Sequence, residues 1–421
     1  SIISFMRVLW FSVTPSLYND ETNEHGGGGW IAALERILTS SHTIELGVAF
    51  LNNKAGNRRV VKNNTVYYPM YIKRSFLQRI YDKFSYKNID PLILEQCVEC
   101  IEDFKPDIIQ IFGSEFCFGM LTKYTNKPIV IHMQGCFPPY NNAQYPPGIS
   151  PLSYALTFWN SPKKLIGLFL RSHLFNERSN REEFILSNNS YFMGRTRWDK
   201  ALVKLYSPKA NYFYCTEALR EEFYKSNSWE KTNDKIFRIV SVGAGHLLKG
   251  YDVVLKAAKL LKNHSELTFE WILVGPQAAS LKSIEKLTKI KCSAVNVVAV
   301  GKKTADELVQ ILLRSDLFVH SSYIDNSSNA ICEAQYLGLP IIATNSGGTP
   351  SLFPSKYDNS LLVPTNDPYY LASKILEMAY DSNKLMMASC LNFSEAHDRH
   401  NPEVIKMSLI DIYEKIINHH N

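Results

Sequence analysis

Two series of short aliphatic and β-branched runs alternate with helical patterns along this chain, and the alternation limits the folds open to it. In the first half the runs span residues 7–13, 43–50, 107–112 and 128–133. In the second half they span residues 237–242, 268–275, 296–301, 317–322 and 340–344. Such a pattern favours parallel sheets covered by helices. Because 421 residues are too many for one ordinary core, each half is expected to form its own Rossmann-like α/β domain.

The expected boundary between the halves is the polar stretch at residues 226–235, which lacks periodicity and precedes a new strand run. This places an N-terminal domain at residues 1–230 and a C-terminal domain at residues 236–400. A last helical pattern follows a polar segment and predicts a C-terminal helix over residues 401–421.

Composition excludes several other classes of protein. Hydrophobic residues make up 45% of the chain and charged residues 20%, which are ordinary globular values. No stretch approaches the roughly 18 uninterrupted apolar residues that span a bilayer, and the first ten residues lack the pattern of a signal peptide. A cytoplasmic location is therefore expected.

The formal charge of +6 lies in the first half of the chain. Residues 1–232 hold 27 Lys and Arg against 21 Asp and Glu, whereas residues 233–421 hold 19 of each. This bias suits an anionic ligand or an anionic membrane surface, and it is too dilute to indicate nucleic acid.

The eight cysteines do not predict a metal site. Cys97 and Cys100 form a close pair, but no second pair or histidine cluster completes a zinc-binding set. We expect buried free thiols and no bound metal.

Residues 136–200 interrupt the strand and helix alternation and read as an insertion in the N-terminal domain. Within it, the segment 151–174 is apolar and basic. Two interpretations stay open: a helix that lies on an anionic membrane surface, or a helix packed on its own domain.

A glycine-containing turn follows the strand run at residues 237–242 and leads into a helix near Gly250. Backbone N–H groups at Gly243 and Gly245, together with the ammonium of Lys249 at a helix N-terminus, make an anion site. The loop differs from a P-loop because GxxxxGK[ST] is absent.

Further motifs follow this turn in order and at close spacing. They are ILVGPQ at 272–277, the segment 299–322, DNSSNAICEAQYLGLPIIAT at 325–344 and NSGGTPSLF at 345–353. This succession resembles the C-terminal domain of family-4 glycosyltransferases, including the bacterial enzymes that build cell-surface polysaccharides. The resemblance implies the GT-B fold, two Rossmann-like domains facing across a cleft, with a C-terminal helix that crosses back to the N-terminal domain.

Members of that family carry two acidic residues separated by seven positions, which here are Asp325 and Glu333. The resemblance implies that Glu333 accepts hydrogen bonds from the ribose hydroxyls of a nucleotide sugar. It places Asp325 beside the donor sugar and phosphates, together with the backbone N–H groups of Ser327, Ser328 and Asn329. The alternative for Glu333 is a helix-edge carboxylate paired with a neighbouring Lys or Arg.

Two positions depart from the family pattern. Members usually grip the diphosphate with an Arg and a Lys five residues apart, but here Ala244 stands where the Arg would precede Lys249. His246 or Arg195 is the candidate for the missing charge. For Arg195 the alternative is a buried ion pair with Asp199 or another carboxylate.

The second departure follows the strand run at residues 128–133, where members commonly have His-Gly and this chain has Gln134 before Gly135. An amide binds a sugar hydroxyl but carries no proton charge, which places a general-base role in doubt. His132 would point to the same face one pleat deeper. Glu115, just after the strand run at 107–112, is a second candidate on the acceptor side.

The glycine-rich run at residues 26–29 opens the first long helix, and Gly28 and Gly29 are candidates for close backbone approach to a phosphate. A plain flexible loop is the alternative. Lys249, Asp325 and Glu333 are the expected catalytic residues, with no metal ion and no cofactor besides the nucleotide-sugar co-substrate.

The function that the resemblance implies is transfer of a sugar from a nucleotide-diphosphate-sugar to an acceptor hydroxyl with retention, in polysaccharide or glycolipid assembly. The implied partners are the sugar donor and a glycan or lipid-linked acceptor at the inner face of the cytoplasmic membrane. A nucleotide-sugar epimerase of the same fold, or a non-catalytic nucleotide-sugar-binding protein, are the alternatives.

Overall fold

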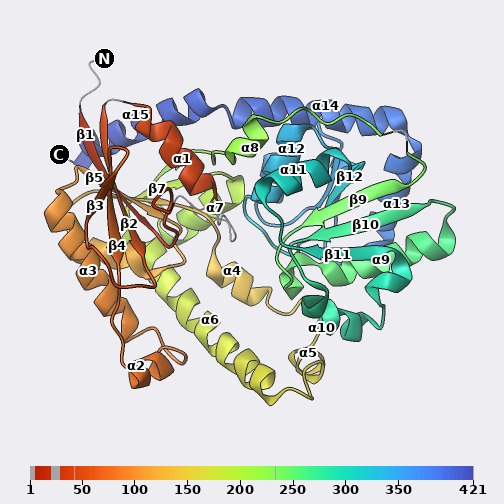
Figure 1. The fold of residues 1–421 in the computed structure, drawn as a ribbon, viewed down its shortest axis with the longest axis horizontal. Helices are drawn as coiled ribbons and strands as arrows, with labels where there is room; N and C mark the ends of the chain where they lie inside the picture. Colours follow the sequence, from red (N-terminus) through yellow and green to blue (C-terminus); the bar gives the residue numbers. More distant parts are fainter. Residues whose placement is uncertain (1–4, 20–28, 42, 233, 421) are drawn as a thin grey trace. The chain divides into compact units, whose positions relative to one another are not determined.

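The computed structural model describes residues 5–19, 29–41, 43–232 and 234–420. The chain divides into two compact units. Unit 1 comprises residues 1–141, 167–218 and 401–421, and unit 2 comprises residues 142–166 and 219–400. Each contains a largely parallel sheet with helices on both faces, which confirms the Rossmann-like α/β interpretation of both halves (Figure 1).

Unit 1 has an eight-stranded sheet in the order β3-β4-β2-β1-β5-β6-β7-β8, in which only β3 pairs antiparallel. Its strands are β1 Met6–Ser12, β2 Ile44–Leu51, β3 Val60–Lys62, β4 Thr65–Met70, β5 Ile108–Phe112, β6 Ile129–His132, β7 Tyr191–Gly194 and β8 Asn211–Tyr214. Its helices are α1 Gly29–Thr39, α2 Phe76–Tyr81, α3 Ile89–Phe104, the 3-10 helix η1 Cys117–Lys123, α4 Phe137–Asn142, α7 Arg197–Tyr206, α15 Pro402–His420 and most of α6 Pro162–Asn188.

Alternate residues of β1 face two separate cores in unit 1. Val8 and Trp10 pack with α1 and α15, whereas Leu9 and Phe11 pack on the opposite face with α3. This period-two arrangement is what a strand buried on both faces requires.

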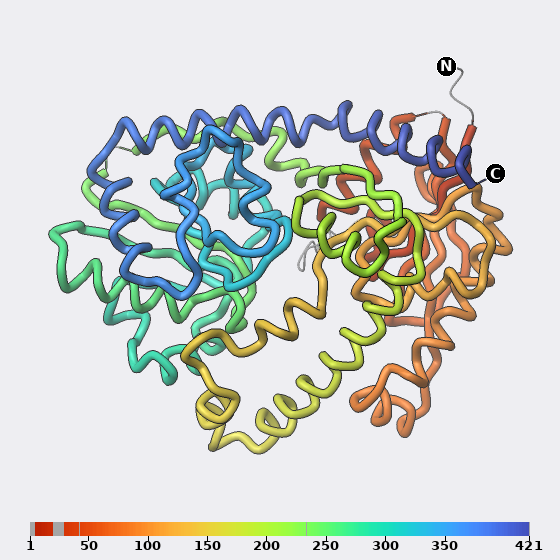
Figure 2. The backbone as a smooth tube through the Cα atoms, turned by 180° about the vertical axis from the view of Figure 1, so that it is seen from behind, coloured from red at the N-terminus to blue at the C-terminus, as the bar shows by residue number. Residues whose placement is uncertain are grey.

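The last helix belongs to unit 1, and Figure 2 shows it running beside the N-terminal strands. Its Tyr413 accepts a hydrogen bond from Nε1 of Trp10 at 3.0 Å and donates one to Gln110. The expectation that the C-terminal helix returns to the N-terminal domain is confirmed.

Unit 2 has a six-stranded parallel sheet in the order β11-β10-β9-β12-β13-β14. Its strands are β9 Phe237–Val242, β10 Phe269–Val274, β11 Val297–Gly301, β12 Leu317–His320, β13 Ile341–Thr344 and β14 Leu362–Val363. Its helices are α5 Pro151–Leu156, α8 Glu221–Tyr224, η2 Leu247–Lys249, α9 Tyr251–His264, α10 Ala278–Thr288, η3 Cys292–Val295, α11 Ala305–Leu313, α12 Asn329–Leu337, η4 Thr349–Leu352, η5 Asn359–Leu361, α13 Pro368–Tyr380 and α14 Ser382–Arg399. α9 packs beside α10 and α13, and α12 packs beside α11 and α14.

The division between the units differs from the sequence-based boundary. The chain enters unit 2 at residue 219 rather than within 226–235, because Leu219 and Phe223 are already buried in the core of unit 2. Residues 142–166, expected in the N-terminal domain, also fall in unit 2. There α5 packs against α10, and Lys286 Nζ donates to the carbonyl of Thr157 at 2.8 Å.

The region 136–200 is not one continuous insertion, because β7 at its C-terminal end is a strand of the main sheet and pairs with β6. The sequence did not predict β3, β4, β7, β8 or β14. All but β4 are only two to four residues long, so their patterns are too short to stand out.

Candidate functional site

The strand order of unit 2 creates a switch point between β9 and β12. The first strand of the unit, β9, lies between β10 and β12. From β9 the chain adds β10 and β11 on one side of the sheet, and it then adds β12, β13 and β14 on the other side. Ligands of open α/β sheets bind outside the carboxyl ends of the strands at such a point. Most of the donor-side residues predicted from sequence lie on the segments that follow these two strand ends.

After β9 the chain passes Gly243 and Gly245, forms the short helix η2 and enters α9 at Gly250. Gly250 has a φ of 71°, and a Cβ atom there would lie 2.8 Å from the carbonyl carbon of Ser321. Only glycine accepts this backbone conformation and this close approach together. The turn therefore brings Lys249 against the loop that follows β12.

Lys249 and Asp325 form an ion pair at this switch point. Lys249 Nζ lies 2.7 Å from Asp325 Oδ2, and His320 Nε2 lies 3.2 Å from the same oxygen. Since a carboxylate only accepts, Nε2 carries the proton and donates to Asp325. These three side chains form the Lys249 cluster.

Burial alone would raise the pKa of Asp325, but the charge of Lys249 and the hydrogen bond from His320 outweigh it and hold the pKa well below its usual range. Burial lowers the pKa of His320, which Asp325 opposes only in part. At neutral pH Asp325 is thus an ionised carboxylate and His320 a neutral imidazole.

Backbone contacts hold the two loops of the cluster together. Ser321 Oγ donates to the Lys249 carbonyl at 2.8 Å, and Tyr323 N donates to the Leu248 carbonyl at 2.8 Å. From the other side, Gly348 N donates to the Asp325 carbonyl at 2.9 Å. The positions of Lys249 and Asp325 are therefore fixed by the backbone as well as by their ion pair.

Glu333 is buried on α12 and is paired with an arginine. Arg220 Nε and Nη2 donate to its two carboxylate oxygens at 2.6 and 2.8 Å. This is the paired arrangement that the sequence left open as the alternative, and it is a two-pronged contact of the kind that Arg makes best. The ribose role of Glu333 stays a prediction.

The remaining donor-side candidates lie nearby in unit 2. Ser327 and Ser328 are buried immediately before α12, and Asn329 is its first residue. The first N–H groups of a helix have no carbonyl partner within the helix, so this end suits an anion. His246 is the N-cap of η2, on the same loop as Lys249.

In unit 1 the acceptor-side candidates gather around the end of β6. Glu115 Oε1 accepts from the N–H of Gly135 at 2.6 Å, which ties it to the loop of the half-buried Gln134. Arg195 Nη2 lies 3.4 Å from the carbonyl of Met133. All three therefore lie close to the carboxyl end of β6, the edge of a parallel sheet where α/β proteins bind ligands.

Arg195 is buried and lies in an ionic setting inside unit 1. Its Nη1 is 3.4 Å from Glu217 Oε2, its guanidinium lies over the ring of Trp30 at 4.9 Å, and its backbone N–H donates to Asp199 Oδ2 at 3.0 Å. The guanidinium thus meets Glu217, one of the carboxylate pairings that the sequence left open.

A second buried carboxylate, Glu182, lies in the same unit. Its Oε1 accepts from Ser114 Oγ at 2.5 Å and its Oε2 accepts from the N–H of Phe137 at 2.6 Å. Burial and the neighbouring charge of Glu115 raise the pKa of Glu182 to about 8. Burial also raises the pKa of Glu115. Two carboxyl groups with raised pKa values therefore lie beside Ser114 and Gly135.

His132 is fully buried and belongs to a structural network. Its Nε2 donates to the Cys215 carbonyl at 3.2 Å, and its Nδ1 accepts from Gln110 Nε2 at 3.3 Å. Burial and the charge of Arg195 lower the pKa of His132 to about 3.

Of the glycine candidates, Gly29 is buried at the start of α1, and Gly28 lies outside the described residues.

Several polar side chains of these sites were not predicted from sequence. Arg220 and His320 contact Glu333 and Asp325, and Glu182 lies in the acceptor-side group. Arg220 is 113 positions from its partner, so no local spacing could indicate the contact. His320 directly precedes SSYID at the end of a strand run, and this place at a strand end was the available signal.

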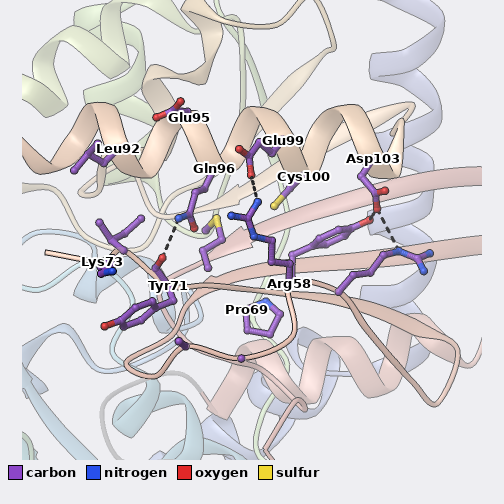
Figure 3. Close-up of a pocket in the computed structure, with 16 residues that line it drawn as sticks. Arg58, Pro69, Tyr71, Lys73, Leu92, Glu95, Gln96, Glu99, Cys100 and Asp103 are labelled. Atoms are coloured by element: carbon purple, nitrogen blue, oxygen red, sulfur yellow. Dashed lines mark hydrogen bonds and ion pairs between the residues drawn. The ribbon is translucent and has the colours of Figure 1, made fainter.

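A separate pocket of about 720 Å³ lies in unit 1 between β4 and α3 (Figure 3). Four of its charged groups form two ion pairs: Arg58 Nη1 lies 3.2 Å from Glu99, and Arg59 Nε lies 3.2 Å from Asp103. None of the predicted site residues lines it.

Solved structures show what fold these two units form. The chain matches a sucrose-phosphate synthase from Thermosynechococcus elongatus with a TM-score of 0.72 and 15% identity, over 98% of this chain and 100% of that one. It matches Anabaena HepE in complex with UDP and glucose with a TM-score of 0.62 and 14% identity, over 97% of this chain and 100% of that one. The class defined by fold and site is the GT-B glycosyltransferase fold.

The family match lies in the unit that holds the Lys249 cluster. Residues 220–391 match the model of glycosyl transferases group 1. This region of the chain is similar to that family, which confirms the resemblance seen in the sequence.

Curated relatives match over part of their length. A D-inositol 3-phosphate glycosyltransferase of Rhodococcus jostii (strain RHA1) is 33% identical over 115 residues, 26% of this chain and 25% of that protein. An amylovoran biosynthesis glycosyltransferase of Erwinia amylovora is 21% identical over 261 residues, 58% of this chain and 61% of that protein. The chain thus spans from a quarter to three fifths of the length of these two relatives.

Proposed function

We propose that this protein is a retaining glycosyltransferase of the hexosyltransferase type, which transfers a sugar from a nucleotide-diphosphate-sugar to an acceptor hydroxyl. The observation that carries the proposal is the Lys249 cluster at the switch point of unit 2, within the region assigned to glycosyl transferases group 1. A UDP-sugar is the first donor class to test, because the similar Anabaena HepE was solved in complex with UDP and glucose.

Lys249 is suited to hold the donor diphosphate. Its ammonium has three N–H donors, and the ion pair with Asp325 uses one of them. The other donors can contact a phosphate while Asp325 keeps the side chain in place. Backbone N–H groups at Gly243, Gly245 and the start of α12 add further donors without any charge of their own.

The reaction breaks the bond between the anomeric carbon and the diphosphate oxygen and forms a bond from that carbon to the acceptor oxygen. The nucleoside diphosphate leaves, and its oxygen takes the proton of the acceptor hydroxyl. In this proposal Lys249 and the backbone donors stabilise the charge on the departing diphosphate, and no metal ion is needed.

On the acceptor side we propose Glu115, Gln134 and Arg195, the group around the end of β6. Gln134 can orient a sugar hydroxyl through its amide but cannot take up its proton. This division of roles agrees with a leaving diphosphate that accepts the proton itself.

The proposed acceptor is a glycan or a lipid-linked glycan in polysaccharide or glycolipid assembly, which the name of the Erwinia relative supports. Among the described helices, none combines the length and the apolarity that crossing a membrane demands. We further propose that segment 151–174 contacts the inner face of the cytoplasmic membrane, since Leu152, Trp159 and Phe169 are exposed and basic residues lie between them.

A thermal-shift panel of UDP, GDP, ADP and CMP sugars tests the donor site. A ligand that binds only the folded state at about 100 times its Kd adds roughly 2.7 kcal/mol of stability. We expect one nucleotide class to give this shift in the wild type, Glu333→Gln to lose most of it, and the exposed Glu230→Gln to retain it. Each variant is compared with its own ligand-free baseline, because Glu333→Gln also weakens the pair with Arg220.

Product analysis with the donor that binds then separates the candidate functions. A new glycoside of unchanged anomeric configuration supports the proposal, an isomerised nucleotide sugar indicates an epimerase, and binding without any product indicates a binding protein. A panel in which no nucleotide sugar stabilises the wild type rejects the donor site.

A further inference from the structure

Helix α2 is an ordered helix that contains no buried residue. Each of its six residues is exposed, including Phe76 at 78% and Leu77 at 66% of their surfaces. Its start is nevertheless well formed, because Ser75 and Gln78 make a reciprocal capping box with hydrogen bonds of 3.2 and 2.8 Å.

In α2 and the turn after it, apolar side chains lie on one side of the helix axis and polar side chains on the other. At 100° per residue, the apolar side chains fall within an arc of about 140°. These are Phe76, Leu77, Ile80, Tyr81 and Phe84, all of which are exposed. The opposite arc holds Gln78, Arg79, Asp82 and Lys83. An amphipathic helix normally buries its apolar arc against its own protein, and this one does not.

Two hydrogen bonds tie the segment to unit 1 directly after this helix. Ser85 Oγ donates to Glu177 Oε1 at 2.9 Å, and the N–H of Tyr86 donates to Glu177 Oε2 at 3.0 Å. Arg74 and Asp82 form an ion pair at 3.0 Å that spans the helix from one end to the other. The helix is thus held in position by its ends while the side chains of its apolar arc are exposed.

The charge around the apolar arc is strongly positive. Residues 73–87 contain five cations, namely Lys73, Arg74, Arg79, Lys83 and Lys87. The same stretch contains one acid, Asp82, which is already paired with Arg74. Since four cations remain beside five exposed apolar side chains, the complementary surface is both apolar and anionic.

We propose that α2 inserts its apolar arc into the interfacial region of an anionic phospholipid membrane while the flanking lysines and arginines contact lipid phosphates. A short helix with a cationic rim and a splayed apolar arc is suited to such a surface. The proposal is independent of the transferase activity and of segment 151–174, because it concerns a helix that neither of them includes.

Vesicle co-sedimentation of the full chain tests the proposal, with vesicles of phosphatidylcholine alone and of phosphatidylcholine mixed with phosphatidylglycerol. We expect binding to the anionic vesicles that weakens with added salt, and little binding to the neutral ones. The Phe76→Ser/Leu77→Ser variant should bind about tenfold more weakly or worse, because two large apolar side chains no longer enter the membrane. The Arg79→Glu/Lys83→Glu variant should show a similar loss.

Two matched controls and a stability check make the outcome specific. Met386→Ser/Met387→Ser removes two exposed apolar side chains elsewhere, and Lys235→Glu/Lys282→Glu reverses two exposed cations elsewhere. Both should bind like the wild type. Since every substituted residue is exposed, unchanged melting temperatures are expected and should be confirmed.

Several results would overturn the proposal. Absence of binding to anionic vesicles does so directly, as does an α2 variant that binds like the wild type. If Trp159→Ser loses binding while the α2 variants bind like the wild type, the membrane contact belongs to segment 151–174 instead. A wild-type dimer that the α2 variant converts to a monomer shows that a second copy, not a membrane, covers the helix.

Discussion

Asp325 is the residue on which the proposed donor site depends most. It accepts from the ammonium of Lys249 and from the imidazole of His320, and these contacts keep it ionised although it is largely buried. A carboxylate held in this way can position Lys249 for a phosphate while it occupies only one of the three N–H donors of the lysine. The sequence predicted both charged residues, but the distance between them follows from two loops that are 76 positions apart.

Glu333 shows where prediction from sequence stops. Its position on a helix after the donor loop followed from the motif, and the structure places it on α12. Its partner Arg220 directly precedes a short helix that the sequence had assigned to the N-terminal domain. A contact across more than a hundred residues leaves no mark in local spacing or periodicity.

His132 makes a prediction about pH. The folded chain keeps this imidazole neutral, with a pKa of about 3, whereas the unfolded chain takes up a proton near the ordinary value of 6.5. Its contribution to stability is therefore complete above pH 6.5 and is lost as the pH falls toward 3. When the pH falls from 7 to 5, we expect this group to lower the free energy of unfolding of the wild type by about 2 kcal/mol.

Urea unfolding of the wild type and of His132→Gln at several pH values measures this contribution. The difference in unfolding free energy between them should shrink by that amount from pH 7 to pH 5. The difference is the relevant quantity, because Glu182 acts in the opposite direction: its raised pKa makes stability fall as the pH rises from about 4.5 to about 8. A difference that stays constant would show that His132 takes up its proton equally in the folded and unfolded chains, and the exposed His264→Gln serves as the control.

At the scale of elements, the junction of η2 and α9 decides the geometry of the donor loop. Gly250 ends the first helix and begins the second with a positive φ, and it touches the backbone of Ser321 in the loop after β12. One residue thus connects the segments after two different strands. The sequence indicated a turn here from its glycines, but the contact with Ser321 exists only in the folded unit.

Gly250→Ala is expected to destabilise the protein by more than about 2 kcal/mol, because it adds both a strained backbone and a collision with a backbone carbonyl. It should also weaken binding of the nucleotide sugar, since Lys249 precedes it directly. Chemical denaturation and the thermal-shift assay measure the two effects. Gly56→Ala is the matched control, because a Cβ there meets no atom within 4 Å in the described structure.

At the scale of the whole molecule, each unit is assembled from separate parts of the chain. Unit 1 needs residues 401–421 to complete the core beside β1, although they lie far from β1 in the sequence. The helix contributes five buried side chains to unit 1, which are Ile405, Leu409, Ile412, Tyr413 and Ile416.

A chain that ends at His400 should therefore lose the stability of unit 1. At about 1.5 to 3 kcal/mol for each buried side chain, the loss is comparable with the whole stability of an ordinary domain. Limited proteolysis with mass spectrometry should show rapid cleavage within residues 1–141 and slower cleavage within 236–400. A chain that ends at Ile417 retains all five side chains and should behave like the wild type; equal protection of unit 1 in both truncations would contradict the expectation.

The sequence by itself determined that each half forms a parallel sheet, where most of the longer strands lie along the chain, and that Lys249, Asp325 and Glu333 are the candidate donor-side residues. Hydrophobic periodicity and short motifs are local properties, so they can be read from neighbouring residues. The tertiary structure decided which chain segments complete each unit, that Arg220 pairs with Glu333, and that the apolar arc of α2 is left uncovered. Those outcomes depend on packing and charge contacts between residues that are far apart in the chain. A pattern among neighbouring residues carries no information about the free energies of such contacts.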